Sequence, residues 1–173
     1  MSNVPFTCRC GVVQGTLHEV GSGNHALCFC QSCRAADIYT GDPDPGSNGI
    51  TVYQTTPDKT SFEAGQDQLA VFSFGPKNLL RWQAGCCGTL LFNTLRSPKA
   101  SFTALRAERV SDKAVLGPVR SRGFIPKENG KHRHEGIRPL ILGMLWRLLV
   151  GRITGRWKQT PFFDVATLEP VAK

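Results

Sequence analysis

Three cysteines within six residues, Cys28, Cys30 and Cys33, are the group in this sequence with the clearest chemical potential. Alternate side chains on an extended strand point the same way, so Cys28 and Cys30 face one side. A turn through Gln31 and Ser32 would bring Cys33 round to meet them. Three converging thiolates are typical of a soft metal site, with zinc as the first candidate. This stretch supplies no fourth protein ligand.

The remaining cysteines form two pairs, Cys8 with Cys10 and Cys86 with Cys87. Two pairs and a triplet fit a closed four-thiolate structural site plus an open three-thiolate site, with room for water or a substrate thiol. Simple burial of free thiols is the alternative. Disulfides are less favoured, because the cysteine number is odd and no secretory leader is recognised. The cytoplasm is therefore the expected location.

Short runs rich in β-branched and aromatic residues, separated by turn residues, predict a mainly β fold of short antiparallel strands. The glycines beside the cysteine pairs favour tight turns. A single helical turn is expected just after Cys33. The predicted strands span 12–20, 25–30, 50–55, 69–74, 79–84, 89–94 and 102–105, with a further short strand within 57–67.

Charge divides the 173-residue chain unevenly. Residues 1–95 carry five Lys or Arg against seven acids, whereas residues 96–173 carry sixteen against six. We therefore expect a β domain over 1–105, a basic extended linker over 106–136, and an apolar helix with a tail over 137–173.

The predicted C-terminal helix begins near Pro139, and its apolar run ends at Ile153. Gly143, Arg147 and Gly151 recur every four residues and mark one small, polar stripe. We expect the apolar remainder to pack on the β domain or in a homodimer. Attachment to a membrane surface, helped by the basic residues 152–158, is less favoured, and the run is too short to span a bilayer.

The order of the cysteines resembles that of the family of glutathione-dependent formaldehyde-activating enzymes and centromere protein V. The match covers roughly residues 6–105. The motifs that carry it are Cys8-x-Cys10-Gly11-x-Val13, Cys28-x-Cys30-x-x-Cys33-Arg34 and Cys87-Gly88-Thr89-Leu90. The resemblance implies a tent-like, all-β zinc fold. It also implies a structural Zn2+ on Cys8, Cys10 and the third cysteine group, and a second, labile Zn2+ on Cys28, Cys30 and Cys33. In the enzymes of the family the second zinc acts on glutathione and its hydroxymethyl adduct, or in carbon–sulfur bond cleavage.

The third cysteine group departs from the family's C-x-x-C-Gly pattern, because Ala84 stands where its first cysteine would be. Cys86 is the substitute ligand that we expect beside Cys87. Neighbours on a regular strand point apart, so both can reach one metal only across a local bulge. Alternatively, Cys86 faces the other site or is an uncommitted thiol.

Three functional hypotheses follow. The first is a carbon–sulfur lyase that acts on a thiol or glutathione adduct at Cys28, Cys30 and Cys33, with Arg34 pairing a substrate carboxylate. The second is a non-catalytic, zinc-stabilised binding module with a closed second site. Nucleic-acid binding by the basic C-terminal half ranks last, because aromatic residues do not interleave its basic ones.

Overall fold

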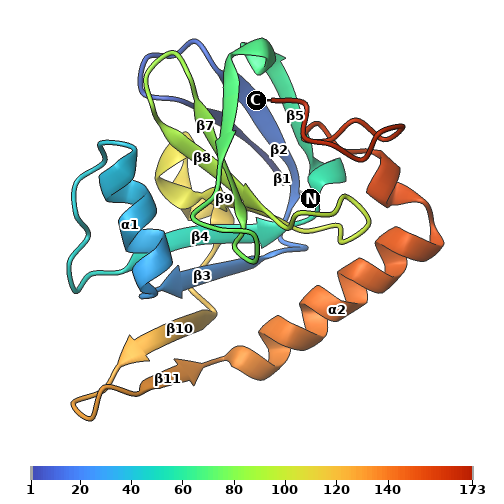
Figure 1. Ribbon diagram of the computed structural model, residues 1–173. Helices are drawn as coiled ribbons and strands as arrows, with labels where there is room; N and C mark the ends of the chain where they lie inside the picture. Colours follow the sequence, from blue (N-terminus) through green and yellow to red (C-terminus); the bar gives the residue numbers. More distant parts are fainter. Residues whose placement is uncertain (1, 173) are drawn as a thin grey trace.

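Two β-sheets and two α-helices make up the fold in a computed structural model that describes residues 2–172 (Figure 1). The smaller sheet has the order β1-β2-β5, with β1 (Ser2–Thr7), β2 (Gln14–Val20) and β5 (Thr60–Ala64). The larger sheet has the order β11-β10-β3-β4-β9-β8-β7-β6 and is antiparallel except where β10 joins β3. Its strands are β3 (Asn24–Cys28), β4 (Ile50–Thr55), β6 (Leu69–Phe72), β7 (Leu80–Ala84), β8 (Leu90–Thr94), β9 (Thr103–Arg106), β10 (Ser121–Pro126) and β11 (His132–Glu135). The predicted mainly β fold with a C-terminal helix is confirmed.

The core contains apolar side chains from both sheets and from the C-terminal tail. Phe6 of β1 meets Phe92 of β8 edge to face, with 5.0 Å between ring centroids. Phe162, from the tail, is fully buried and lies 5.0 Å from the ring of Trp82 on β7. The tail therefore docks into the core, and each buried aromatic ring contributes about 2–3 kcal/mol of transfer free energy.

The predicted strand at 50–55 is confirmed at both ends, but β1 was not predicted. Only Val4 and Phe6 of β1 are buried, and Pro5 lies between them. A run this short and proline-interrupted carries a weak strand signal.

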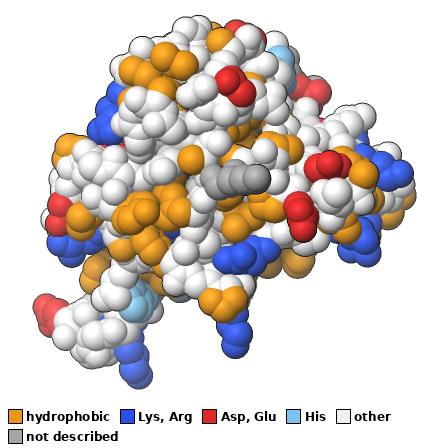
Figure 2. Space-filling view, turned by 45° about the horizontal axis from the view of Figure 1, so that its top comes forward, with side chains coloured by type: hydrophobic (Ala, Val, Ile, Leu, Met, Phe, Trp, Pro, Cys, Tyr) orange, Lys and Arg blue, Asp and Glu red, His pale blue; other side chains and the backbone are white. Residues whose placement is uncertain are grey.

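The basic segment over 106–136 differs from the extended linker that we expected. It contains β10 and β11, and β10 pairs with β3 in parallel, with Ser121 opposite Ala26. Buried Ser121 accepts a hydrogen bond from the Asn24 amide at 2.8 Å. The hairpin's charged side chains lie outward where it projects from the body of the molecule (Figure 2). Short 3-10 helices complete the fold, at η1 (Pro57–Lys59), η2 (Gln66–Gln68), η3 (Ala107–Arg109), η4 (Lys113–Leu116) and η5 (Arg156–Lys158).

Helix α1 (Gln31–Tyr39) is longer than the single turn that we predicted, and an ion pair holds it on the larger sheet. Asp37 of α1 accepts from the guanidinium of Arg106 on β9, and both side chains are about 6% exposed. Burial raises the pKa of Asp37, although the charge of Arg106 and its hydrogen bond act in the opposite direction. The pair fixes the helix whose first turn contains Cys33.

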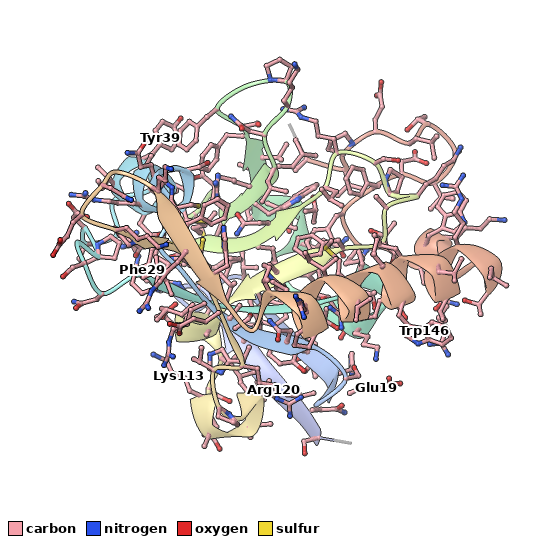
Figure 3. The ribbon with its side chains drawn as sticks, turned by 90° about the horizontal axis from the view of Figure 1, so that it is seen from below. Glu19, Phe29, Tyr39, Lys113, Arg120 and Trp146 are labelled. Carbon is pink, nitrogen blue, oxygen red and sulfur yellow. The ribbon has the colours of Figure 1, made fainter. Side chains whose placement is uncertain are left out.

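Helix α2 (Ile137–Ile153) crosses one side of the molecule (Figure 3). Two members of its small, polar stripe contact the β domain. Gly151 is buried beside Ser101, and Arg147 donates to the Ser22 carbonyl at 3.4 Å. The apolar remainder, which we expected to be buried, is largely exposed in the single chain. None of the described helices is long and apolar enough to cross a membrane.

We predict that Asp37→Ala lowers the free energy of unfolding by about 3–5 kcal/mol, because Arg106 would keep a buried charge without its partner. Urea unfolding followed by circular dichroism measures the change. The matched control is Asp44→Ala, which removes an exposed carboxylate paired with Arg34 and leaves stability nearly unchanged. Equal effects of the two substitutions would contradict a structural role for the buried pair.

Candidate metal centres

Four cysteines from two turns meet where the smaller sheet approaches the larger one. Cys8 and Cys10 lie in the turn after β1, and Cys86 and Cys87 lie in the turn between β7 and β8. Their four sulfur atoms all lie within 4.8 Å of one another. We call this group the first centre.

Sulfur spacing in the first centre suits tetrahedral metal coordination. Metal–sulfur bonds of about 2.3 Å, as for zinc, put the sulfurs of a tetrahedral site about 3.8 Å apart. The Sγ atoms of Cys8 and Cys10 are 3.5 Å apart, those of Cys8 and Cys86 are 3.9 Å apart, and those of Cys10 and Cys86 are 3.2 Å apart. The first centre could therefore hold a metal ion.

Cys86 and Cys87 reach the same point because neither belongs to a strand. We expected a bulge in a strand, but the chain leaves β7 at Ala84 and makes a turn in which Gly88 has a φ of 71°. The matching turn after Cys8 places Gly11 at a φ of 79°. Both angles lie in the left-handed region that glycine adopts without steric cost. Cys86 therefore joins the first centre rather than facing the triplet.

Hydrogen bonds favour the thiolate form of two cysteines of the first centre, Cys8 and Cys87, whereas burial and hydrogen bonds with the neighbouring cysteines raise the pKa of Cys86. The backbone N–H of Val13 donates to the Cys8 sulfur at 3.3 Å. Burial acts against ionisation of Cys87, but hydrogen bonds, first among them the one with the Thr89 side chain, outweigh it and lower the pKa of Cys87 to about 6. Thiolate is the form that binds a metal.

Arg9, between the first two cysteines, braces the centre from outside. Its guanidinium donates to the Cys87 carbonyl at 3.0 Å and to Asp42 at 3.1 Å, beyond the end of α1. Its backbone N–H donates to the Thr89 hydroxyl at 3.1 Å. Arg9 was not predicted as part of the site, because a lone arginine in a cysteine turn has no distinctive spacing in the sequence.

Cys28, Cys30 and Cys33 form the second centre, at the junction of β3 and α1. Cys28 ends β3, Cys30 is the N-cap of α1, and Cys33 lies in the first turn of the helix. Their sulfurs lie within 4.8 Å of one another, so this group too could hold a metal ion. No fourth Cys, His, Asp or Glu joins the group anywhere in residues 2–172.

The start of α1 and the cation of Arg81 make the second centre favourable for negative charge. The Cys30 sulfur accepts from the backbone N–H of Cys33 at 3.4 Å, at the positive end of the helix dipole. Hydrogen bonding with Cys28, and then with Cys33, lowers the pKa of Cys30 to about 2, and the charge of Arg81 acts in the same direction. The hydrogen bond with Cys30 raises the pKa of Cys28. Of the three sulfurs, that of Cys30 is therefore the most favoured as a thiolate.

Arg81 on β7 is 1% exposed and holds the first turn of α1 against the larger sheet. Its Nη2 donates to the Ser32 hydroxyl at 2.8 Å and to the Ser32 carbonyl at 3.0 Å, and its Nη1 donates to Asn93 at 2.9 Å. Arg81 could have been recognised in the sequence as a charged residue among the apolar residues of a predicted strand. We did not predict it as part of the site.

A pocket of about 460 Å³ opens onto the second centre. The three cysteines and Arg81 line it together with two further cations, Lys77 and Arg96. Apolar side chains from β4, from the segment before β9 and from β10 contribute to the wall, among them Val52, Phe102 and Phe124, and polar residues such as Gln54 and Asn93 also line it. Lys77 is exposed, whereas Arg96 donates to the backbone of Asn78 and Gly75.

Arg34, which we expected to face a substrate carboxylate, already has a carboxylate partner on the surface. Its Nε donates to Asp44 Oδ1 at 2.6 Å, and its Nη2 bonds the other oxygen of the same carboxylate. Arg34 is absent from the lining of the pocket. Adjacency to Cys33 in sequence does not place it there, because successive residues of a helix diverge by about 100°.

Comparison with known proteins places the chain in a family. Residues 1–166 match the model of the family of unknown function DUF6151. The chain belongs to this family. No curated protein matches it. A crystal structure of a Rhodobacter sphaeroides protein is similar, with 18% sequence identity, a TM-score of 0.49 and coverage of 66% of this chain and 96% of that chain.

We predict that the purified chain holds two metal ions and that the two centres differ in their effect on stability. Cys8→Ser should lower the metal content to one ion and lower the free energy of unfolding by several kcal/mol, because the first centre joins two sheets. Cys33→Ser should also lower the content to one ion while the fold persists. Elemental analysis and urea unfolding of both variants measure this. Metal-free wild-type protein, or equal losses of stability in the two variants, would contradict it.

Proposed function

We propose that this protein is a zinc protein similar to the glutathione-dependent formaldehyde-activating enzymes and that it acts on a carbon–sulfur bond at the second centre. The single observation that carries the proposal is the contrast between the centres. Four cysteines surround the first, whereas three cysteines at the second open onto a pocket. Structural zinc sites are closed by four protein ligands, and catalytic sites keep one position for substrate. The order of the cysteines also resembles that of the glutathione-dependent formaldehyde-activating enzymes. This resemblance supports zinc as the metal and a thiol-linked compound as the substrate.

The residues of the pocket have distinct roles in this proposal. Cys28, Cys30 and Cys33 would hold zinc, which when bound lowers the pKa of a thiol and stabilises its thiolate. Arg81 is a positioning residue that fixes the first turn of α1 through Ser32 and compensates the negative charge of the cysteines. Lys77 and Arg96, among the pocket lining, suit the carboxylates of a substrate such as a glutathione adduct.

The reaction is the reversible cleavage of a hemithioacetal, the S-hydroxyalkyl adduct of a thiol. The hydroxyl proton leaves, its oxygen forms the carbonyl double bond, and the electron pair of the carbon–sulfur bond goes to sulfur. The products are an aldehyde, a thiolate and one proton, so no oxidant or reductant is needed. Val52, Phe102 and Phe124 provide apolar wall in the pocket where the thiolate would depart.

The test is the interconversion of glutathione, formaldehyde and their hydroxymethyl adduct, followed by proton exchange spectroscopy. Cys33→Ser should abolish the enzyme-dependent rate. Arg81→Lys should lower it by about 10–100-fold, because lysine keeps the charge but loses the paired bonds to Ser32. The matched control is Arg120→Lys, at an exposed position outside the pocket lining.

Two results would overturn the proposal. One is full turnover by Cys33→Ser. The other is a wild-type protein with both centres loaded that neither turns over nor binds the adduct, which would favour the non-catalytic binding module.

A further inference from the structure

Five apolar side chains on α2 form a continuous exposed stripe, although the helix is part of a folded domain. They are Leu142, Leu145, Trp146, Leu149 and Ile153, and each is more than half exposed. Their spacing of three and four residues places them on one face of the helix. A contiguous exposed apolar face of this kind marks an interaction surface rather than a solvated helix.

The chain segment that contains this stripe carries basic charges alone. Arg138 and Arg152 are exposed near the two ends of α2, and Arg156 and Lys158 follow in η5. No acidic residue occurs between Glu135 and Asp164. The β11 strand that precedes α2 adds exposed Arg133, which shares the Glu135 carboxylate with Arg122.

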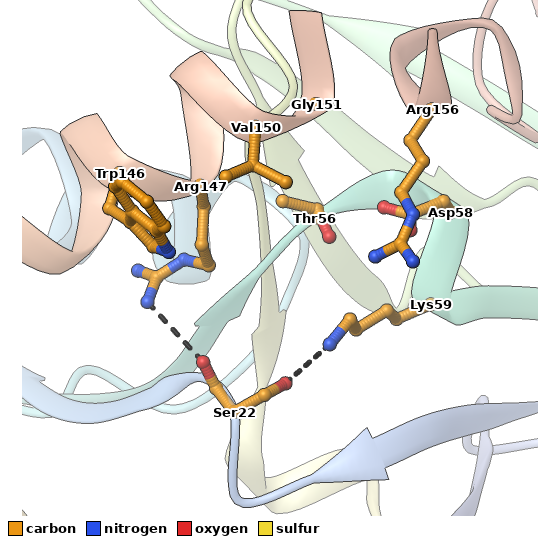
Figure 4. A pocket seen from close by; sticks show the side chains of 9 residues that line it. All are labelled: Ser22, Thr56, Asp58, Lys59, Trp146, Arg147, Val150, Gly151 and Arg156. Carbon is orange, nitrogen blue, oxygen red and sulfur yellow. Dashed lines mark hydrogen bonds between the residues drawn. The ribbon is translucent and has the colours of Figure 1, made fainter. Parts of the chain in front are cut away.

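A pocket of about 240 Å³ lies beside the stripe, between α2 and the turn that contains Ser22 (Figure 4). Lys59, Arg147 and Arg156 line it, with Asp58 as the carboxylate of the lining and Glu19 bonded to Lys59 at 2.8 Å. The Nη2 group of Arg147 is buried without a hydrogen-bond partner among residues 2–172. Its neighbour Trp146 belongs both to this pocket and to the apolar stripe.

We infer that α2 is a docking surface for an anionic lipid bilayer. The apolar stripe lies in the boundary between headgroups and acyl chains, with the helix parallel to the membrane. The flanking cations meet anionic headgroups, and the indole of Trp146 suits the same boundary. The cation pocket beside Trp146 provides donors for a headgroup phosphate.

Charge favours a lipid surface over a second copy of this chain. A symmetric dimer through the stripe would bring the same patch of both copies together. The arginines of two acid-free helices would then face one another, and like charges across an interface are unfavourable. An anionic bilayer neutralises these charges instead.

The inference is tested with the full chain and sedimenting vesicles of phosphatidylcholine, with or without about 30 mol% phosphatidylglycerol. Binding should be at least about tenfold tighter to the anionic vesicles and should weaken as salt is raised. Leu142→Glu/Leu149→Glu should lower binding to the anionic vesicles by at least about tenfold. The control Ile38→Glu/Val171→Glu makes the same charge change at two exposed apolar positions outside α2 and should bind like wild type.

Thermal unfolding establishes that both double variants are folded, and their metal content reports the two centres independently of α2. Equal binding of wild type to neutral and anionic vesicles would overturn the inference, as would equal losses in the two double variants. Sedimentation velocity completes the test. A wild-type dimer that only Leu142→Glu/Leu149→Glu dissociates would assign the stripe to a second copy and overturn the lipid surface.

Discussion

The convergence of four sulfur atoms between two sheets is the constraint on which the rest of this structure depends. Cys8 and Cys10 follow β1 of the smaller sheet, and Cys86 and Cys87 precede β8 of the larger one. Two glycines with positive φ angles make the turns that aim these sulfurs at one point. A metal there would crosslink segments about 80 residues apart in sequence, so that its binding energy would become folding energy. Strand β7, which leads into the turn of Cys86 and Cys87, also carries Arg81 to the second centre.

Both candidate centres consist of cysteines, but their surroundings differ. In the first, the backbone N–H of Val13 donates to the Cys8 sulfur and Arg9 donates to the Cys87 carbonyl, while Cys10 and Cys86 are exposed. In the second, the helix start and Arg81 compensate negative charge on one side, while the other side faces a pocket with further cations. The number of cysteines, four in the first centre and three in the second, and the pocket beside the second are the features that distinguish the two.

Much of this was predictable from local pattern. The run of β-branched and aromatic residues over 50–55 predicted strand β4. The spacing of Cys28, Cys30 and Cys33 predicted that their side chains converge. Contacts between distant segments were not predictable. Arg81 reaches Ser32, and Asp37 reaches Arg106, across pairings that only the sheet order creates. The path of Cys86 depended on whether residues 85–89 form a strand or a turn, and neighbouring cysteines do not decide between them. The outward apolar face of α2 was also missed, because periodicity shows which residues share a face but not which face is covered.

The central claim is that the second centre is a three-cysteine zinc site whose remaining position takes a substrate thiol. A crystal structure of the purified protein soaked with glutathione, with anomalous scattering recorded at the zinc edge, tests it most directly. We predict zinc bound by the sulfurs of Cys28, Cys30 and Cys33, with the glutathione sulfur as the fourth ligand. A fourth ligand from the protein itself, or no zinc among these three cysteines, would contradict the account.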